Sequence, residues 1–284
     1  MQPGLPERAR FLKIVVGAVL LWGLAGGTAG CTNGPSPAQG YSSFGALDTI
    51  ASSAAPRDSA LALLGRMRRA AFDSAFARLD AYGVTRQVRT EQLDTTGATT
   101  AVRTLTVRYP AGAAAGTVQR ADSVGTFGRG GLFSGITPRQ QPRARPPNLA
   151  AQALADQPAY LAPRTQEAYR YALRPGSLWD GTPVLVVEAK ARAEGRGADQ
   201  SIRYARLTID RASHELVGLT TTRISRILLF QEQSQVTIRL RPGPSGQEAT
   251  AWVPHLTRVR ALVNVPFRAP RQFRTVSSYY EYAQ

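Results

Sequence analysis

The chain contains few of the residues that cross-link a protein or catalyse reactions. Its 284 residues include one cysteine and two histidines, and lysine supplies only two of the 35 basic side chains. A single cysteine excludes an internal disulfide bond. A domain of the length available here can rely instead on its own hydrophobic core.

Neither histidine lies in a pattern that predicts catalysis. His214 stands in a predicted turn beside Glu215, and His255 stands in the segment VPHLTR. Neither shows the spacing of a metal site or a nucleophile motif such as G-x-S-x-G. The carboxylates are scattered over different predicted strands; two of them could still meet in space, as glycoside hydrolysis needs, but the sequence gives no positive sign of such a pair. We therefore expect no catalytic residue, no metal ligand and no cofactor. The strand aromatics are expected in the core and at its rim, with a glycan-stacking platform as the alternative.

Negative charge is scarce too, since 19 acidic residues face 35 basic ones and the net charge is +16. Almost all of the positive charge is arginine, whose guanidinium group matches phosphate in a bidentate way. Anionic lipid headgroups or lipopolysaccharide are the acidic partners that fit an exported chain, and nucleic acid is not expected as a partner. The alternative is that the arginines reflect only a GC-rich genome, in which arginine codons are used in place of lysine codons.

One strongly apolar run stands near the N-terminus and none elsewhere. Residues 14–25, IVVGAVLLWGLA, carry no charge and follow Arg8, Arg10 and Lys13. Twelve residues are too few to cross a bilayer, which takes ~20, but they have the length of a signal-peptide core. Small residues then lead to Cys31, the only cysteine.

This junction resembles the lipobox of bacterial lipoproteins, in which small residues precede an invariant cysteine. The resemblance implies a signal peptide over residues 1–30, recognised by the signal peptidase at Thr28, Ala29 and Gly30. Cys31 would then become the N-terminus, with diacylglycerol on its thiol and an acyl chain such as palmitate on its amine. Thr28 stands where the family usually has leucine. An ordinary secretory signal or an uncleaved anchor are the alternatives.

Residues 31–55 are rich in glycine, proline, serine and alanine, which predicts a flexible tether. Thr32 favours the outer membrane and a periplasm-facing domain, because an aspartate there would resemble an inner-membrane retention signal. Loss of residues 1–30 removes three cations and one anion, so the remaining chain keeps a net charge of +14.

A single β-rich domain is predicted over residues 56–284, and it opens with one long amphipathic helix. In residues 56–78 the apolar side chains recur at helical spacing: Ala60, Leu64, Met67, Ala71 and Ala75. We expect this helix to cover a sheet, with a position on the membrane surface as the alternative.

About nine strands follow, and short turns join most of them. Asp94–Gly97 predicts a hairpin turn between the first two strands. In residues 226–241 apolar and polar residues alternate, which is typical of an antiparallel sheet with one buried and one wet face. The sequence therefore predicts an α+β fold that is mostly antiparallel β, with the strands in a large curved meander.

Residues 110–147 interrupt the strands as a flexible Gly-, Pro- and Arg-rich insert. Its segment FGRGGLFSG is not a dinucleotide fingerprint, because Phe133 stands where the third glycine would be. Such a loop is either functional or disordered. The functional version is a lid over a ligand, carried by four apolar residues: Phe127, Leu132, Phe133 and Ile136.

One amphipathic helix that leads into a long antiparallel meander, on a lipobox chain, looks like the lipoprotein-localisation factor family. Residues 204–223, YARLTIDRASHELVGLTTTR, are similar to a strand–turn–strand of that family, and the Tyr-rich residues 276–284 also fit. The resemblance implies an unclosed half-barrel whose concave apolar face holds acyl chains. The residues expected to line that face are Leu207, Ile209, Leu228, Phe230, Val236 and Ile238.

Two functions remain open at this point. The first is a lipid-anchored envelope protein that binds an acyl chain or lipid in its sheet, without chemistry. The alternative is a structural or interaction lipoprotein with a solid core, whose arginine-rich loops contact an envelope protein or an anionic surface. Salt separates them, because an arginine-driven contact weakens steeply with ionic strength.

Overall fold

The computed structural model describes residues 57–127, 154, 158–192, 202–227, 230–244, 251–264 and 270–283. The segments predicted as signal peptide and tether lie outside the described residues. The elements in chain order are α2 (Arg57–Arg66), α3 (Ala70–Ser74), the 3-10 helix η2 (Ala77–Ala81), β1 (Gly83–Leu93), β2 (Thr99–Tyr109), β3 (Thr117–Val124), the 3-10 helix η4 (Gln166–Ala168), β4 (Tyr169–Trp179), β5 (Thr182–Ala191), β6 (Ile202–Asp210), β7 (Leu216–Ile227), β8 (Phe230–Pro242), β9 (Trp252–Asn264) and β10 (Arg271–Ala283).

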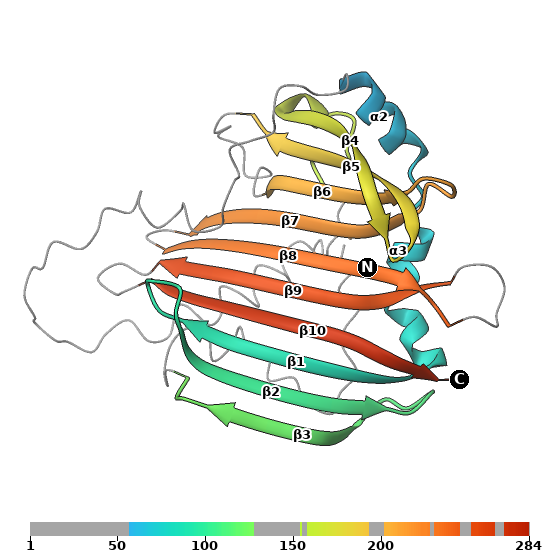
Figure 1. Ribbon diagram of the computed structural model, residues 1–284. Helices are drawn as coiled ribbons and strands as arrows, with labels where there is room; N and C mark the ends of the chain where they lie inside the picture. The colour runs from blue at the N-terminus through green and yellow to red at the C-terminus, as the bar shows by residue number, and fades with distance from the viewer. Residues whose placement is uncertain are drawn as a thin grey trace, which may run out of the picture.

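The ten strands form one antiparallel sheet in the order β3-β2-β1-β10-β9-β8-β7-β6-β5-β4 (Figure 1). From β4 to β10 each strand pairs with the next one in the chain. The last strand, β10, then pairs with β1, so the first and last strands of the chain lie side by side. β3 and β4 form the two edges and do not pair with each other, so the sheet is open. The predicted antiparallel, mostly β fold is confirmed.

The sheet has ten strands rather than about nine, because residues 117–124 of the predicted insert form β3. Seven of the eight residues of β3 are exposed, so the strand lacks the apolar alternation that would reveal it in the sequence. It is held by pairing with β2. The last part of that insert, residues 128–147, lies outside the described residues.

The single helix predicted over residues 56–78 is not confirmed as one element. It is divided into α2, α3 and η2, and the chain between α2 and α3 extends to meet β7. There the Arg68 amide donates to the His214 carbonyl oxygen at 2.8 Å, and the Leu216 amide donates to the Arg68 carbonyl oxygen at 2.9 Å. Glu215 adds an ion pair of 3.2 Å to Arg68. These bonds replace the helical ones, so the helix breaks here.

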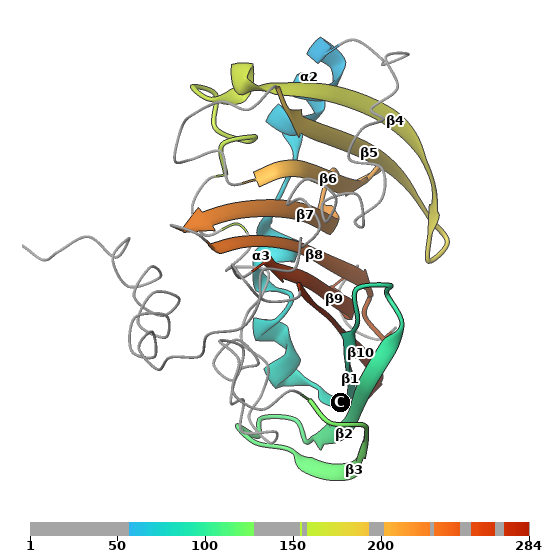
Figure 2. The ribbon, with the colours of Figure 1, turned by 90° about the vertical axis from the view of Figure 1, so that its left-hand side faces the viewer.

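The helices lie on one side of the sheet, which we call the helix face (Figure 2). α2 contacts β4, α3 contacts β7, and η2 contacts β1 and β9. Their buried residues, such as Leu63, Phe72 and Leu79, share one hydrophobic core with the strands. Phe76 meets Tyr279 of β10 edge to face, with the ring centroids 6.0 Å apart. None of the described helices is long and apolar enough to cross a membrane.

The hairpin between β4 and β5 curls over the opposite side of the sheet (Figure 1). Its Trp179 donates an indole hydrogen bond of 2.9 Å to the carbonyl oxygen of Leu240. The guanidinium carbon of Arg239 lies 4.9 Å from the centre of the tryptophan ring. One corner of this second face is therefore covered by the sheet's own end.

Candidate functional site

The residues expected to line an acyl-chain cup lie partly in the core. Val236 is half-buried against that core. Leu228 lies outside the described residues, and only the backbone of Phe230, the first residue of β8, is described. The other three are at most 1% exposed and share the hydrophobic core with α2 and α3: Leu207, Ile209 and Ile238.

Most of the other predicted site residues cannot be placed in the fold. Phe127 of the predicted lid is half-buried and follows β3. Outside the described residues lie Leu132, Phe133 and Ile136 of the lid, and Thr28, Ala29, Gly30 and Cys31 of the lipobox.

The two histidines lie apart from each other. His214 sits in the turn between β6 and β7 with a φ of 57°. His255, on β9, is half-buried; burial lowers the pKa of its imidazole, with only Asp180 acting the other way and Arg241 adding to the fall. Across the described ranges no three His, Cys, Asp or Glu side chains converge as a metal site requires.

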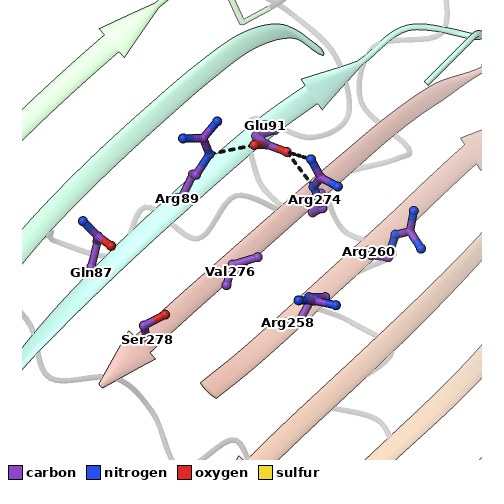
Figure 3. Close-up of a pocket in the computed structure, with 8 residues that line it drawn as sticks. All are labelled: Gln87, Arg89, Glu91, Arg258, Arg260, Arg274, Val276 and Ser278. Atoms are coloured by element: carbon purple, nitrogen blue, oxygen red, sulfur yellow. Dashed lines mark hydrogen bonds and ion pairs between the residues drawn. The ribbon is translucent and has the colours of Figure 1, made fainter. Parts of the chain in front are cut away.

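A polar pocket of about 380 Å³ opens on the face of the sheet opposite the helices. Figure 3 shows its side chains standing on β1, β10 and β9. We call this pocket the arginine groove. Its lining residues are Gln87, Arg89, Glu91, Arg258, Arg260, Arg274, Val276 and Ser278.

The strand register arranges the charged residues of the groove in two rows. Adjacent strands are ~4.8 Å apart, so each row of three residues spans about 10 Å. Four guanidinium groups and one carboxylate therefore share a small area of rigid sheet. The rows are Arg89–Val276–Arg258 and Glu91–Arg274–Arg260.

Glu91 binds two of the four arginines. The Arg89 Nε atom donates to Glu91 Oε1 at 2.7 Å, and Arg274 Nε donates to Glu91 Oε2 at 2.5 Å. The Glu91 side chain is only 7% exposed, whereas those of Arg89 and Arg274 are 55% and 39% exposed. The groove thus presents the cations to the solvent and hides the carboxylate beneath them.

The electrostatics of Glu91 follow from these contacts. Burial works to raise the pKa of the Glu91 carboxyl, but the hydrogen bonds and positive charges of Arg89 and Arg274 outweigh it, so the pKa is lowered. The carboxylate stays ionised at neutral pH and makes a weak base.

Like charges crowd the other side of Arg274. Arg260 lies directly across from Arg274 and two residues from Arg258 on β9. Burial, followed by repulsion from Arg274 and Arg258, lowers the pKa of the Arg260 guanidinium. Arg258 is exposed and makes no ion pair within the described part of the chain. Such an arrangement of cations favours the arrival of an anion.

Sequence reasoning missed this groove. The signal is present, because Arg89 and Glu91 stand two apart and so do Arg258 and Arg260, which places each pair on one face of a strand. What could not be read is that β10 inserts between β1 and β9. Only that pairing, between the first and the last strand, brings the three segments together.

No protein-family model matches the chain, and no curated protein matches it. Three solved structures are similar in shape. A domain described as an outer membrane lipoprotein-sorting protein from Vibrio parahaemolyticus is 11% identical, with 80% of this chain and 93% of that one covered and a TM-score of 0.30.

The second structure, a DUF1329 family protein from Desulfovibrio piger, is 10% identical, with coverages of 80% and 92% and a TM-score of 0.27. The third, a LolA superfamily protein from Nitrosomonas europaea, is 11% identical, with coverages of 81% and 93% and a TM-score of 0.22. TM-scores below 0.5 are too low for these likenesses to indicate a function for this chain.

Proposed function

We propose that this protein is a non-catalytic binding protein of the bacterial envelope whose arginine groove holds an anionic, phosphate-bearing ligand. The observation that carries the proposal is the array of four arginines around one buried carboxylate on three adjacent strands. Guanidinium groups bind phosphate in a bidentate way. Because a sheet holds them at fixed spacing, little order has to be imposed when the ligand binds.

Glu91 supports binding rather than catalysis. As the single carboxylate of the groove it is engaged by Arg89 and Arg274. Its lowered pKa makes it a poor general base, and its ion pairs orient two of the cations. The proposed role of Glu91 is therefore to position arginines.

The envelope location rests on the sequence. A cationic start, a short apolar run and small residues before Cys31 support export and lipidation. Two or more acyl chains anchor a protein durably where one does not. A phosphate-bearing lipid headgroup and a free phosphate compound are the two sources of the proposed ligand in such a place.

A titration of the full chain in a neutral detergent tests the proposal. Sodium pyrophosphate is the soluble probe, and dihexanoyl phosphatidylglycerol is the phospholipid probe. The double variant Arg258→Gln/Arg260→Gln should weaken binding by about a hundredfold or more, since each of the two lost charged hydrogen bonds contributes ~1.5–3 kcal/mol. The control is Arg103→Gln, because Arg103 is exposed on β2 and by strand alternation faces the other side.

Binding of pyrophosphate alone would assign a free phosphate compound, and binding of the phospholipid alone would assign a headgroup. Equal weakening by the double variant and the control would contradict the groove as the site. So would binding that does not fall when the ionic strength rises.

A further inference from the structure

The strand β3 lies at one edge of the sheet, with its outer backbone edge paired to no other strand that the structure describes. β2 is its only neighbour among the described strands, and seven of its eight residues are exposed. Figure 1 shows β3 at one margin of the sheet. Val124, at its end, is 71% exposed. An edge of this length without proline or lysine is a template for a further strand.

The sequence of β3 is complementary to itself. Residues 118–124 read VQRADSV, with Arg120 and Asp122 on either side of Ala121. In the single chain Arg120 and Asp122 pair with each other at 2.5 Å, with side chains 71% and 50% exposed. A pair so exposed adds little stability, and both groups remain accessible to a partner.

We infer that β3 pairs antiparallel with β3 of a second copy of this chain, about a two-fold axis through Ala121. Opposite residues of antiparallel strands must share a face. Only pairings whose residue numbers add to an even sum satisfy this rule for two identical strands.

Charge then selects one register. Centred on Ala121, the register places Arg120 of each copy opposite Asp122 of the other. Centred on Arg120 or on Asp122, the register sets like charges directly opposite, which is destabilising. The favoured register thus forms two ion pairs across the new edge.

The consequence is a continuous sheet across two chains. A two-fold axis perpendicular to the sheet keeps each face on its own side, so both arginine grooves face the same way. The two grooves would then bind a surface that bears many anions with higher avidity than one alone. The pairing itself does not depend on what the grooves bind.

Sedimentation velocity of the full chain in neutral detergent tests the pairing, at concentrations up to about 100 µM because an eight-residue edge makes a small interface. The dimer should form with the unaltered chain. Arg120→Asp alone and Asp122→Arg alone should each weaken it by about tenfold or more. The double variant Arg120→Asp/Asp122→Arg should restore it. The control Arg170→Asp, exposed on the other edge strand β4, should leave it unchanged.

A second measurement reports the register itself. On a Cys31→Ser background, Ala121→Cys faces its own copy and should form a disulfide-linked dimer on mild oxidation. In the same register Ser123 lies opposite Gln119 of the other copy, four residues from its own equivalent. Ser123→Cys should therefore form no such disulfide. Three results would each overturn the inference. The unaltered chain could stay monomeric, the single charge reversals could leave the dimer as stable as before, or the double variant could fail to dimerise. Unchanged far-UV circular dichroism verifies that the variants fold.

Discussion

The two faces of the sheet are built from the same strands, but one is covered by apolar packing and the other carries exposed arginines. On β10, Tyr279 is 1% exposed and packs edge to face against Phe76. The neighbouring Ser278 opens into the arginine groove. Apolar burial contributes ~25 cal/mol for each Å² removed from water. The helix face therefore stabilises the fold, whereas half-exposed arginines contribute little to it.

Arg86 is charged and yet buried. Arg86 lies on the helix face and is 7% exposed. Its Nη2 atom donates to the Ser277 hydroxyl at 3.2 Å, and its guanidinium carbon lies 5.8 Å from the centre of the Tyr279 ring. A buried cation is thus held by a hydroxyl and an aromatic face. The groove differs because two of its four cations share one carboxylate and still remain partly exposed to an anion.

The largest effect should come from Ile238→Ala on the helix face. Ile238 is 1% exposed in the core, and truncating such a side chain costs ~2–4 kcal/mol of unfolding free energy. Urea unfolding measures the loss. The control Arg206→Ala, on β6 and exposed, should change the unfolding free energy by less than about 0.5 kcal/mol.

The same variant separates the solid core from the acyl-chain cup predicted by the sequence. If Ile238 instead lines a ligand site, the variant should keep its stability and lose any lipid that co-purifies with the unaltered chain. Native mass spectrometry of both proteins detects such a lipid. A stable variant with reduced lipid would therefore show that the helix face encloses a ligand site rather than a solid core.

The class of the fold could be predicted because alternation and turns are local signals. The Asp94–Gly97 turn forms as predicted: Gly97 has a φ of 87°, and the Asp94 carboxylate accepts from the Thr96 and Ala98 amides at 2.8 and 2.9 Å. The broken helix could not be predicted, because the contacts that break it come from His214 and Leu216, far along the chain.

The site was harder to predict than the fold. Its apolar candidates, such as Leu207, follow strand alternation, which marks a buried face but cannot say whether a cavity or a helix covers it. Its arginines follow the same alternation. Their meeting depends on the pairing of β10 with β1, a long-range contact that no local pattern of residues encodes.

An intermediate effect is expected from Glu91→Gln in the groove. Loss of the carboxylate's charge removes the ion pairs that orient Arg89 and Arg274, so binding of pyrophosphate should weaken by a few-fold, while the unfolding free energy falls by about 1–2 kcal/mol. Titration and urea unfolding measure the two changes. The control Asp73→Asn removes a half-buried ion pair with Arg69 at α3, away from the groove; it should leave pyrophosphate binding unchanged and lower the unfolding free energy by only about 0.5 kcal/mol.

The pH dependence of stability isolates the same carboxylate. Because the pKa of Glu91 is lowered in the folded chain, its contribution is fully present above the unfolded pKa, ~4.3. That contribution is lost as the pH falls through the lowered folded value. Comparison of urea unfolding at neutral and acid pH should therefore show a smaller acid loss in Glu91→Gln than in the unaltered chain. An equal loss in both would exclude Glu91 as the source.

The smallest effect should come from Gly218→Ala, beneath the hairpin that covers one corner of the groove's face. A Cβ atom at residue 218 would lie 3.0 Å from two ring carbons of Trp179, so the ring must shift by a few tenths of an ångström. We expect a loss of less than about 1 kcal/mol, because the gain from removing a flexible glycine offsets part of the strain.

Tryptophan fluorescence should report that shift, since the ring moves relative to the Arg239 guanidinium stacked on it. Gly65→Ala is the matched control: nothing lies within 4 Å of its added Cβ, and alanine in a helix gains about 0.5–1 kcal/mol over glycine. If Gly218→Ala stabilised the chain as much as the control and left the fluorescence unchanged, the hairpin would not be packed on this face. No described segment would then cover the groove's face, and the contrast with the helix face would be sharper.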